Sequence, residues 1–148
     1  MRRGPLLLGC AGVAWLGACG AGEESLSAAC TERAHVEEAL QRAPQDVALA
    51  DGIRLSRCVR DASTPALLQN LGATLTGISE DLETRAGADP AAAVRLGYLI
   101  GAVRRGVEGS SGQAAELAHR LERSGAQIDD PEAAAALLRG LRAGERSG

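Results

Sequence analysis

The chain has almost no aromatic side chains. Its 148 residues include no Phe, one Trp (Trp15) and one Tyr (Tyr98), and all of its basic residues are Arg. Proteins that bind single-stranded nucleic acid stack bases on aromatic rings over a positively charged surface. This chain lacks those rings and carries a formal net charge of -3. We therefore expect no nucleic-acid partner.

Residues that favour β-strands are also scarce. Val, Ile and Thr together number 16, whereas there are 29 Ala and 20 Leu, so the composition favours helix over strand. A chain of this length has room for one domain. The sequence therefore predicts a single all-α domain.

The first 19 residues have the layout of a secretory leader. Arg2 and Arg3 precede an apolar run over 6–16 that is too short to cross a bilayer core, and small residues follow it. The segment Leu16-Gly17-Ala18-Cys19 resembles the lipobox of bacterial lipoproteins. That resemblance implies cleavage between Ala18 and Cys19 and attachment of lipid to the Cys19 thiol. It divides the N-terminus into a signal peptide over 1–18 and a lipidated terminus with a short tether over 19–26.

Three other interpretations of the leader stay open. Leu7-Leu8-Gly9-Cys10 fits the same four-residue pattern, but it leaves few apolar residues before the cut. An ordinary secretory leader cleaved after Gly20 or Ala21, or an uncleaved anchor, is also compatible with the sequence. Each interpretation places the remainder outside the cytoplasm, and the resemblance to lipoproteins implies that it is anchored to a membrane of the bacterial cell envelope. Because Gly20 and not Asp follows Cys19, the resemblance to lipoproteins implies the outer membrane in a cell that has two membranes.

Two cysteines remain after the leader is assigned. If Cys10 is removed and Cys19 carries lipid, Cys30 and Cys58 are left, and a pair of thiols in an exported protein predicts a disulfide. Closing this loop of about 29 residues stabilises the fold by roughly 3.5 kcal/mol in the chain-entropy model. The alternative is two buried, reduced cysteines in a cytosolic protein.

Apolar periodicity predicts a compact bundle of five to six amphipathic helices over 27–143, in which that disulfide links two helices. Three of the helices start with a capping residue followed by proline, at Thr64-Pro65, Asp89-Pro90 and Asp130-Pro131. We expect residues 144–148 to fray. The expected helices cover about 27–43, 52–62, 65–86, 90–107, a stretch from 113 to 125, and 131–143.

Gly97 and Gly101 lie one turn apart on the most apolar of these helices. With few large side chains available, we expect them to let a neighbouring helix pack closely. A membrane-dimer motif is the weaker interpretation, because the apolar stretch is about 13 residues long, contains Arg95, and is shorter than the ~20 residues a span needs.

Catalytic patterns are missing from the sequence. His35 and His119 lie on different predicted helices and match no metal motif, and there is no nucleophile elbow or phosphate loop. We therefore predict no catalytic residues, no metal and no cofactor. The expected function is a non-enzymatic helical module that is held at the membrane by lipid and contacts another envelope protein.

Two other functions remain as alternatives. One is a carrier of a lipid or small apolar ligand in a cavity between helices. The other is an enzyme in which a histidine meets a carboxylate in a cleft. The cavity of the carrier would be lined by Leu71, Leu75, Leu96, Ile100 and Val103.

Arginines recur every three residues at Arg54, Arg57 and Arg60, and Arg104 and Arg105 end another helix. They predict either contact with anionic headgroups or an acidic partner, or a solvated face with local pairs such as Arg57 with Asp61; the sequence favours the solvated face. Without Arg2 and Arg3, 14 Arg oppose 19 acidic residues, so general attraction to an anionic membrane is not expected.

Overall fold

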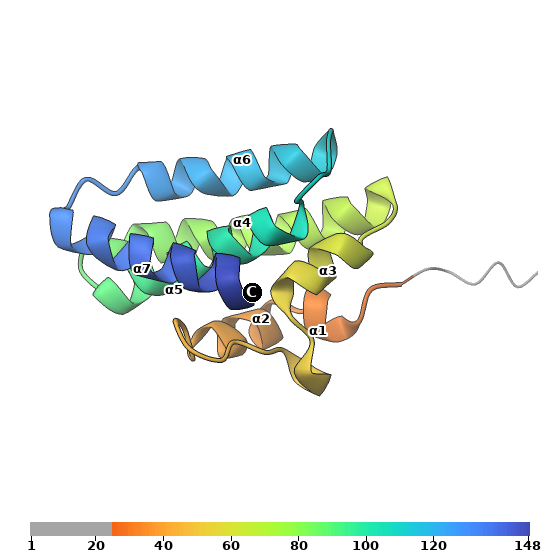
Figure 1. The fold of residues 1–148 in the computed structure, drawn as a ribbon, viewed down its shortest axis with the longest axis horizontal. Coiled ribbons are helices and arrows are strands. Elements are labelled where there is room, and N and C mark those ends of the chain that lie inside the picture. Colours follow the sequence, from red (N-terminus) through yellow and green to blue (C-terminus); the bar gives the residue numbers. More distant parts are fainter. Residues whose placement is uncertain (1–24) are drawn as a thin grey trace, which may run out of the picture.

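The three longest helices begin where the sequence places a capping residue before proline. A computed structural model of the chain describes residues 25–148 (Figure 1). In it, α4 (Pro65–Ala86), α5 (Pro90–Gly106) and α7 (Pro131–Ser147) start at the predicted prolines. Each cap accepts a backbone N–H, which satisfies a donor that the first helical turn leaves unpaired: Thr64 from Leu67 at 3.3 Å, Asp89 from Ala91 at 2.9 Å, and Asp130 from Ala133 at 2.8 Å.

The predicted all-α class is confirmed for residues 25–148, which contain no strand. The expected count of five to six helices is too low, because this part of the chain forms seven α-helices and one 3-10 turn. The remaining elements are α1 (Ala28–Thr31), α2 (Arg33–Leu40), the 3-10 turn η1 (Ala50–Gly52), α3 (Leu55–Asp61) and α6 (Gln113–Ala126).

The expected helix over 27–43 is divided at Glu32. This residue has an extended backbone, with φ -81° and ψ 117°, so α1 ends before it and α2 begins after it. The carbonyl of Thr31 accepts a hydrogen bond from the Thr74 hydroxyl of α4 at 3.1 Å, outside the helical ladder. Contact with a distant helix therefore accompanies the break that the local pattern did not predict.

The helix that was expected over 52–62 is shorter in the structure, where α3 begins only at Leu55. Asp51 and Gly52 have left-handed backbones, with φ 58° and 73°, and form the turn η1 before the chain enters α3. Aspartate and glycine tolerate this region better than most residues do. Because of this turn, the helix begins at Leu55 and not at residue 52.

The expectation that residues 144–148 fray is wrong. Helix α7 continues to Ser147, and both Gly144 and Gly148 are buried. The Ser56 hydroxyl of α3 donates a buried hydrogen bond of 2.5 Å to the Gly148 carbonyl. Burial and this bond hold the end of the chain against α3, so the domain extends beyond 143.

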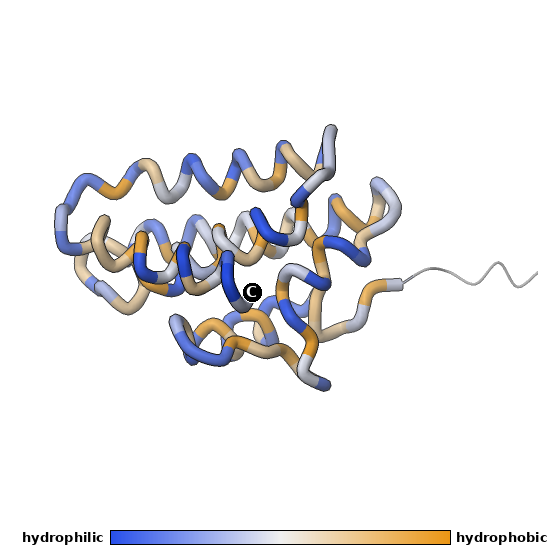
Figure 2. The backbone as a smooth tube through the Cα atoms, viewed as in Figure 1, coloured by the Kyte–Doolittle hydropathy of each residue, from blue (hydrophilic) through white to orange (hydrophobic). Residues whose placement is uncertain are grey.

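Helix α5 occupies the centre of the bundle. From Ala92 to Val103 all of its residues except Arg95 are buried, and the ring of Tyr98 is fully enclosed. Helices α4, α6 and α7 run along it, while α1, α2 and α3 lie together on one side of these long helices (Figure 1). Apolar and polar residues alternate along α6 and α7, which places one face of each against this core (Figure 2).

The closest helix contact joins α5 to α7 through glycines on both helices. A Cβ added at Gly97 would overlap the Leu137 carbonyl oxygen, and one at Gly101 would overlap that of Leu141. Gly97 and Gly101, which the sequence spacing singled out, therefore lie where the main chain of a neighbouring helix leaves no room for a side chain.

Two glycines of α7 meet α5 in the same way. A Cβ at Gly140 would overlap the Val94 carbonyl oxygen, and one at Gly144 that of Tyr98. This pair was not predicted from the sequence, although its spacing of four residues repeats that of the α5 pair. The interface is thus reciprocal, because each helix supplies two glycines to the other.

Candidate functional site

A disulfide fixes the end of the molecule at which the described chain begins. Cys30 of α1 and Cys58 of α3 are bonded with an S–S distance of 2.03 Å and a Cα–Cα distance of 5.6 Å, and both are buried. The predicted disulfide is therefore present, and it joins two helices that are each too short to be stable alone.

The N-terminal cleft lies beside this disulfide. It is a hollow of about 580 Å³ between residues 25–27, the turn η1 and one side of α3. Leu26, Ile53 and Cys30 supply apolar lining. Arg54, Arg57 and Arg60 all line it as well, so the arginine series from the sequence faces one cleft.

Two of these arginines have ion-pair partners. Arg54 Nη1 lies 2.7 Å from Asp46 Oδ1 and donates to the Val47 carbonyl at 3.1 Å. Arg57 Nε lies 2.9 Å from Asp61 Oδ2, so the local pair that the sequence suggested is formed. Arg60 is exposed and has no ion-pair partner among residues 25–148.

The α2–α4 cleft is a second hollow, of about 480 Å³, between α2, α4 and α5. Leu40, Ile78 and Leu82 form its apolar part, and Arg85 and Arg95 stand among its polar lining. A third hollow of about 330 Å³ lies between α4 and α6.

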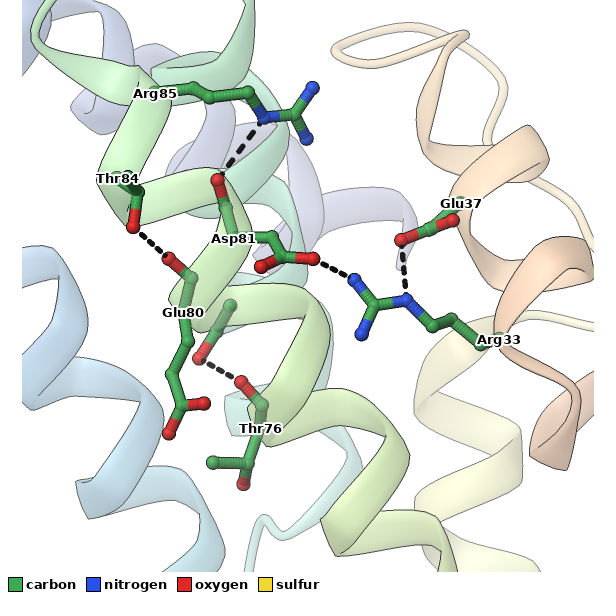
Figure 3. Close-up of polar contacts among 8 residues, drawn as sticks. Arg33, Glu37, Thr76, Glu80, Asp81, Thr84 and Arg85 are labelled. Carbon is green, nitrogen blue, oxygen red and sulfur yellow. Dashed lines mark hydrogen bonds and ion pairs between the residues drawn. The ribbon is translucent and has the colours of Figure 1, made fainter.

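Arg33 fastens α2 to α4 beside the α2–α4 cleft (Figure 3). Its Nε donates to Glu37 at 2.8 Å and its Nη2 donates to Asp81. Hydrogen bonding to Glu37, together with the charges of Glu37 and Asp81, raises the pKa of Arg33 above its ordinary value, against the opposing effect of burial. Arg85 in turn donates to the Asp81 main-chain carbonyl at 3.1 Å (Figure 3). Within this cluster the Arg33–Asp81 pair joins α2 to α4, and the Arg33–Glu37 pair lies within α2.

Arg104 and Arg105 are also occupied by contacts within the bundle. Arg104 bridges Glu122 of α6 at 2.7 Å and Glu145 of α7 at 3.0 Å, and its hydrogen bond to Glu122 raises its pKa. Arg105 donates to the main-chain carbonyls of Glu145 at 3.0 Å and of Arg146. These two arginines therefore tie the end of α5 to its neighbours.

The two histidines stand on different helices: His35 of α2 is part-buried, and His119 of α6 is exposed. His35 Nδ1 is buried and lies 3.5 Å from Glu32 Oε2. The two atoms are within ion-pair distance, but they form no hydrogen bond. His119 Nδ1 lies 3.2 Å from Glu122 Oε2, with 67% of its side chain exposed. Neither histidine lines any of the three hollows.

The residues expected to line a carrier cavity are packed together in the core. Leu71, Leu75, Leu96, Ile100 and Val103 are each exposed by 2% or less, and the three hollows described above are lined by other residues. Within residues 25–148 no group of three or more His, Cys, Asp or Glu side chains is placed to hold a metal ion. No helix in this same part has the length and hydropathy that a bilayer span requires.

The predicted cleavage site between Ala18 and Cys19, and the lipid attachment at Cys19, lie outside the described residues. Of the features sequence reasoning singled out, the structure brings together the cysteine pair and the arginine series at the N-terminal cleft. No known protein family, no curated protein and no solved structure matches this chain.

Proposed function

We propose that this protein is an exported lipoprotein whose helical domain acts as a non-enzymatic interaction module in the bacterial cell envelope. In this proposal residues 1–18 are removed, Cys19 carries the lipid, and the following residues tether the domain to the outer face of a membrane. The lipid supplies the location, and the folded domain supplies a surface for another envelope protein.

The Cys30–Cys58 disulfide is the observation that carries this proposal. Disulfides persist in extracytoplasmic compartments and are rare in the reducing cytosol. Both sulfurs are buried, and the bond joins helices that flank the beginning of the described chain. An oxidised pair directly after a lipoprotein-like leader supports export.

The arrangement of titratable groups favours binding over catalysis. Arg33 and Arg104 join helices through the carboxylates of Asp81, Glu122 and Glu145, and Glu37 pairs with Arg33 within α2. Neither histidine lines one of the three hollows described above. An enzyme requires convergent polar groups in a cleft, whereas a binding module needs only surface.

Intact-mass measurement on the membrane fraction tests the proposal. The expected mass lacks the first 18 residues, carries a diacylglyceryl group, and is two hydrogens lighter than the reduced chain. Cys19→Ala should abolish the lipid, whereas Cys10→Ala, the matched control, should leave it in place. An unprocessed chain in the soluble fraction, with its thiols open to alkylation, would contradict the proposal.

Crosslinking in intact envelopes tests the interaction role. We expect a crosslinked protein product that depends on the folded domain. If the lipidated chain gives only crosslinks to lipid in every condition, the module has no protein partner.

A further inference from the structure

The N-terminal cleft is the place at which the chain enters the domain. Ser25 and the two residues after it form part of its wall. Six peptide steps separate Ser25 from Cys19, and these steps reach at most about 20 Å even when fully extended. A lipid on Cys19 would therefore hold this cleft close to the headgroups of the bilayer.

The cleft presents hydrogen-bond donors that the protein itself does not use. A guanidinium group has five N–H donors in a planar fork. In Arg57 the Nε pairs with Asp61, and neither Nη atom has a hydrogen-bond partner among residues 25–148. No guanidinium nitrogen of Arg60 has a partner in that range either. Two arginines one turn apart thus face the same hollow with free donors, in the fork geometry that binds phosphate oxygens.

The acidic groups of the cleft weaken this attraction without cancelling it. Asp51 and Asp61 line the same hollow, and Asp61 is engaged by Arg57. The Arg57 and Asp61 side chains are 66% and 50% exposed, and exposed pairs of this kind contribute little to stability. A phosphate can therefore compete for Arg57. The attraction is local, because the chain beyond the leader is acidic as a whole.

The apolar part of the lining suits the region of a lipid next to its phosphate. Leu26 and Ile53 are half-buried and lie beside the disulfide in the wall of the cleft. These side chains can contact the glycerol portion of a headgroup that the arginines hold by its phosphate. A free phosphate ion would leave this apolar wall unused.

We infer that the N-terminal cleft binds the phosphate of an anionic phospholipid headgroup through Arg57 and Arg60, so that the domain stands on the membrane with α3 facing it. This inference rests on the proposed lipid anchor. It goes beyond that anchor because it orients the domain and assigns a ligand to a cleft.

The experiment uses the lipidated chain in nanodiscs that contain phosphatidylglycerol with a photoreactive headgroup. Intact mass first establishes that the chain carries lipid. After illumination, peptide mapping locates the crosslinks, which we expect in peptides covering 25–31 and 50–61. The double variant Arg57→Gln, Arg60→Gln should lower these crosslinks at least about fivefold, because each basic residue at an anionic surface contributes a factor of about five and the variant removes two.

Arg139→Gln with Arg142→Gln is the matched control. These exposed arginines on α7 have no ion-pair partner among residues 25–148, so the control makes the same change of charge away from the cleft. It should leave the crosslinks unchanged, as should the circular dichroism of both double variants. Nanodiscs in which phosphatidylcholine carries the photoreactive group in place of phosphatidylglycerol should give crosslinks as few as those of the cleft variant.

Three results would overturn the inference. If a lipidated chain gives equal crosslinks with and without Arg57 and Arg60, the cleft does not hold the headgroup and the anchor alone stands. If the crosslinks centre on α6 and α7, the domain has the opposite orientation. If the mass shows no lipid, the proposed anchor fails and the inference fails with it.

Discussion

The two ends of the chain hold their helices together by different means. Residues 25–62 form three short helices and a turn. A disulfide joins two of these helices through cysteines that are 28 residues apart in the sequence. Residues 63–148 form four long helices, two of which meet main chain to main chain at glycines. Short helices bury too little surface to stay in place alone, so a covalent bond compensates there. Long helices gain enough contact when glycine lets them approach.

The largest effect is expected from removing the covalent bond. Replacing both Cys30 and Cys58 by Ala should lower the free energy of unfolding by about 3.5 kcal/mol, because the unfolded chain regains the freedom of the closed loop. Urea denaturation followed by circular dichroism measures the loss. Native-state hydrogen exchange should show α1 to α3 opening before α5 and α7. If hydrogen exchange of the double variant is faster by the same factor in all helices, the disulfide does not stabilise α1 to α3 in particular.

A methyl group in the glycine interface should have the next largest effect. Gly140→Ala places a Cβ against the Val94 carbonyl, and main chain has no rotamer by which to move aside. We expect a loss of about 3 kcal/mol, at the upper end of the usual cost of overpacking. Urea denaturation of the purified variant measures it.

Gly72→Ala is the control for this substitution. In α4 the added Cβ would lie 3.5 Å from a Leu117 methyl carbon, an ordinary contact distance. Because alanine favours helix over glycine by up to about 1 kcal/mol, this variant should be as stable as the parent or more stable. If both variants have the stability of the parent, close approach is not what holds α7 to α5.

The smallest effect concerns the charges that join α5 to α6 and α7. Burial by itself raises the pKa of Glu122, but hydrogen bonds from Arg104 and His119 outweigh it, so the pKa is lowered. A lowered pKa in the folded state stabilises the fold above the unfolded value of about 4.3, and this contribution is lost as the pH falls through the folded value. The protein should therefore lose stability in acid below about pH 4.3.

Glu122→Gln should make that acid decline shallower and cost less than about 1 kcal/mol at pH 7, because the Arg104 side chain of the pair is 44% exposed. Urea denaturation at a series of pH values measures both. Glu116→Gln is the control, since that carboxylate lies 3.7 Å from Arg123 and forms a looser pair. An identical acid slope in the parent and in Glu122→Gln would show that this pair does not contribute.

Features that are local in sequence could be predicted, and features that join distant residues could not. The starts at Pro65, Pro90 and Pro131 depend on a cap one residue earlier, and the structure has all three. The break at Glu32 accompanies a hydrogen bond to Thr74, 43 residues after Thr31. The ordered C-terminus depends on Ser56, 92 residues before Gly148. Neither partner is visible in a local pattern.

At the candidate site, too, local features could be predicted and contacts between distant segments could not. Counting cysteines was enough to predict the Cys30–Cys58 bond, because only two remained after the leader. The spacing of Arg54, Arg57 and Arg60 showed that they recur every three residues along one short segment. It did not show that the entering chain and the turn at Asp51 form a cleft with these arginines. That arrangement depends on three segments whose relative positions no local pattern contains.

The glycine interface limits how this chain can vary. At Gly97, Gly101, Gly140 and Gly144 an added carbon would meet main-chain atoms, which are the same for every residue type. No substitution of a facing side chain can make room for it. Distant relatives of this fold can therefore be sought by a sequence pattern of two glycine pairs. Three residues separate the glycines of each pair, and 38 residues separate the two pairs.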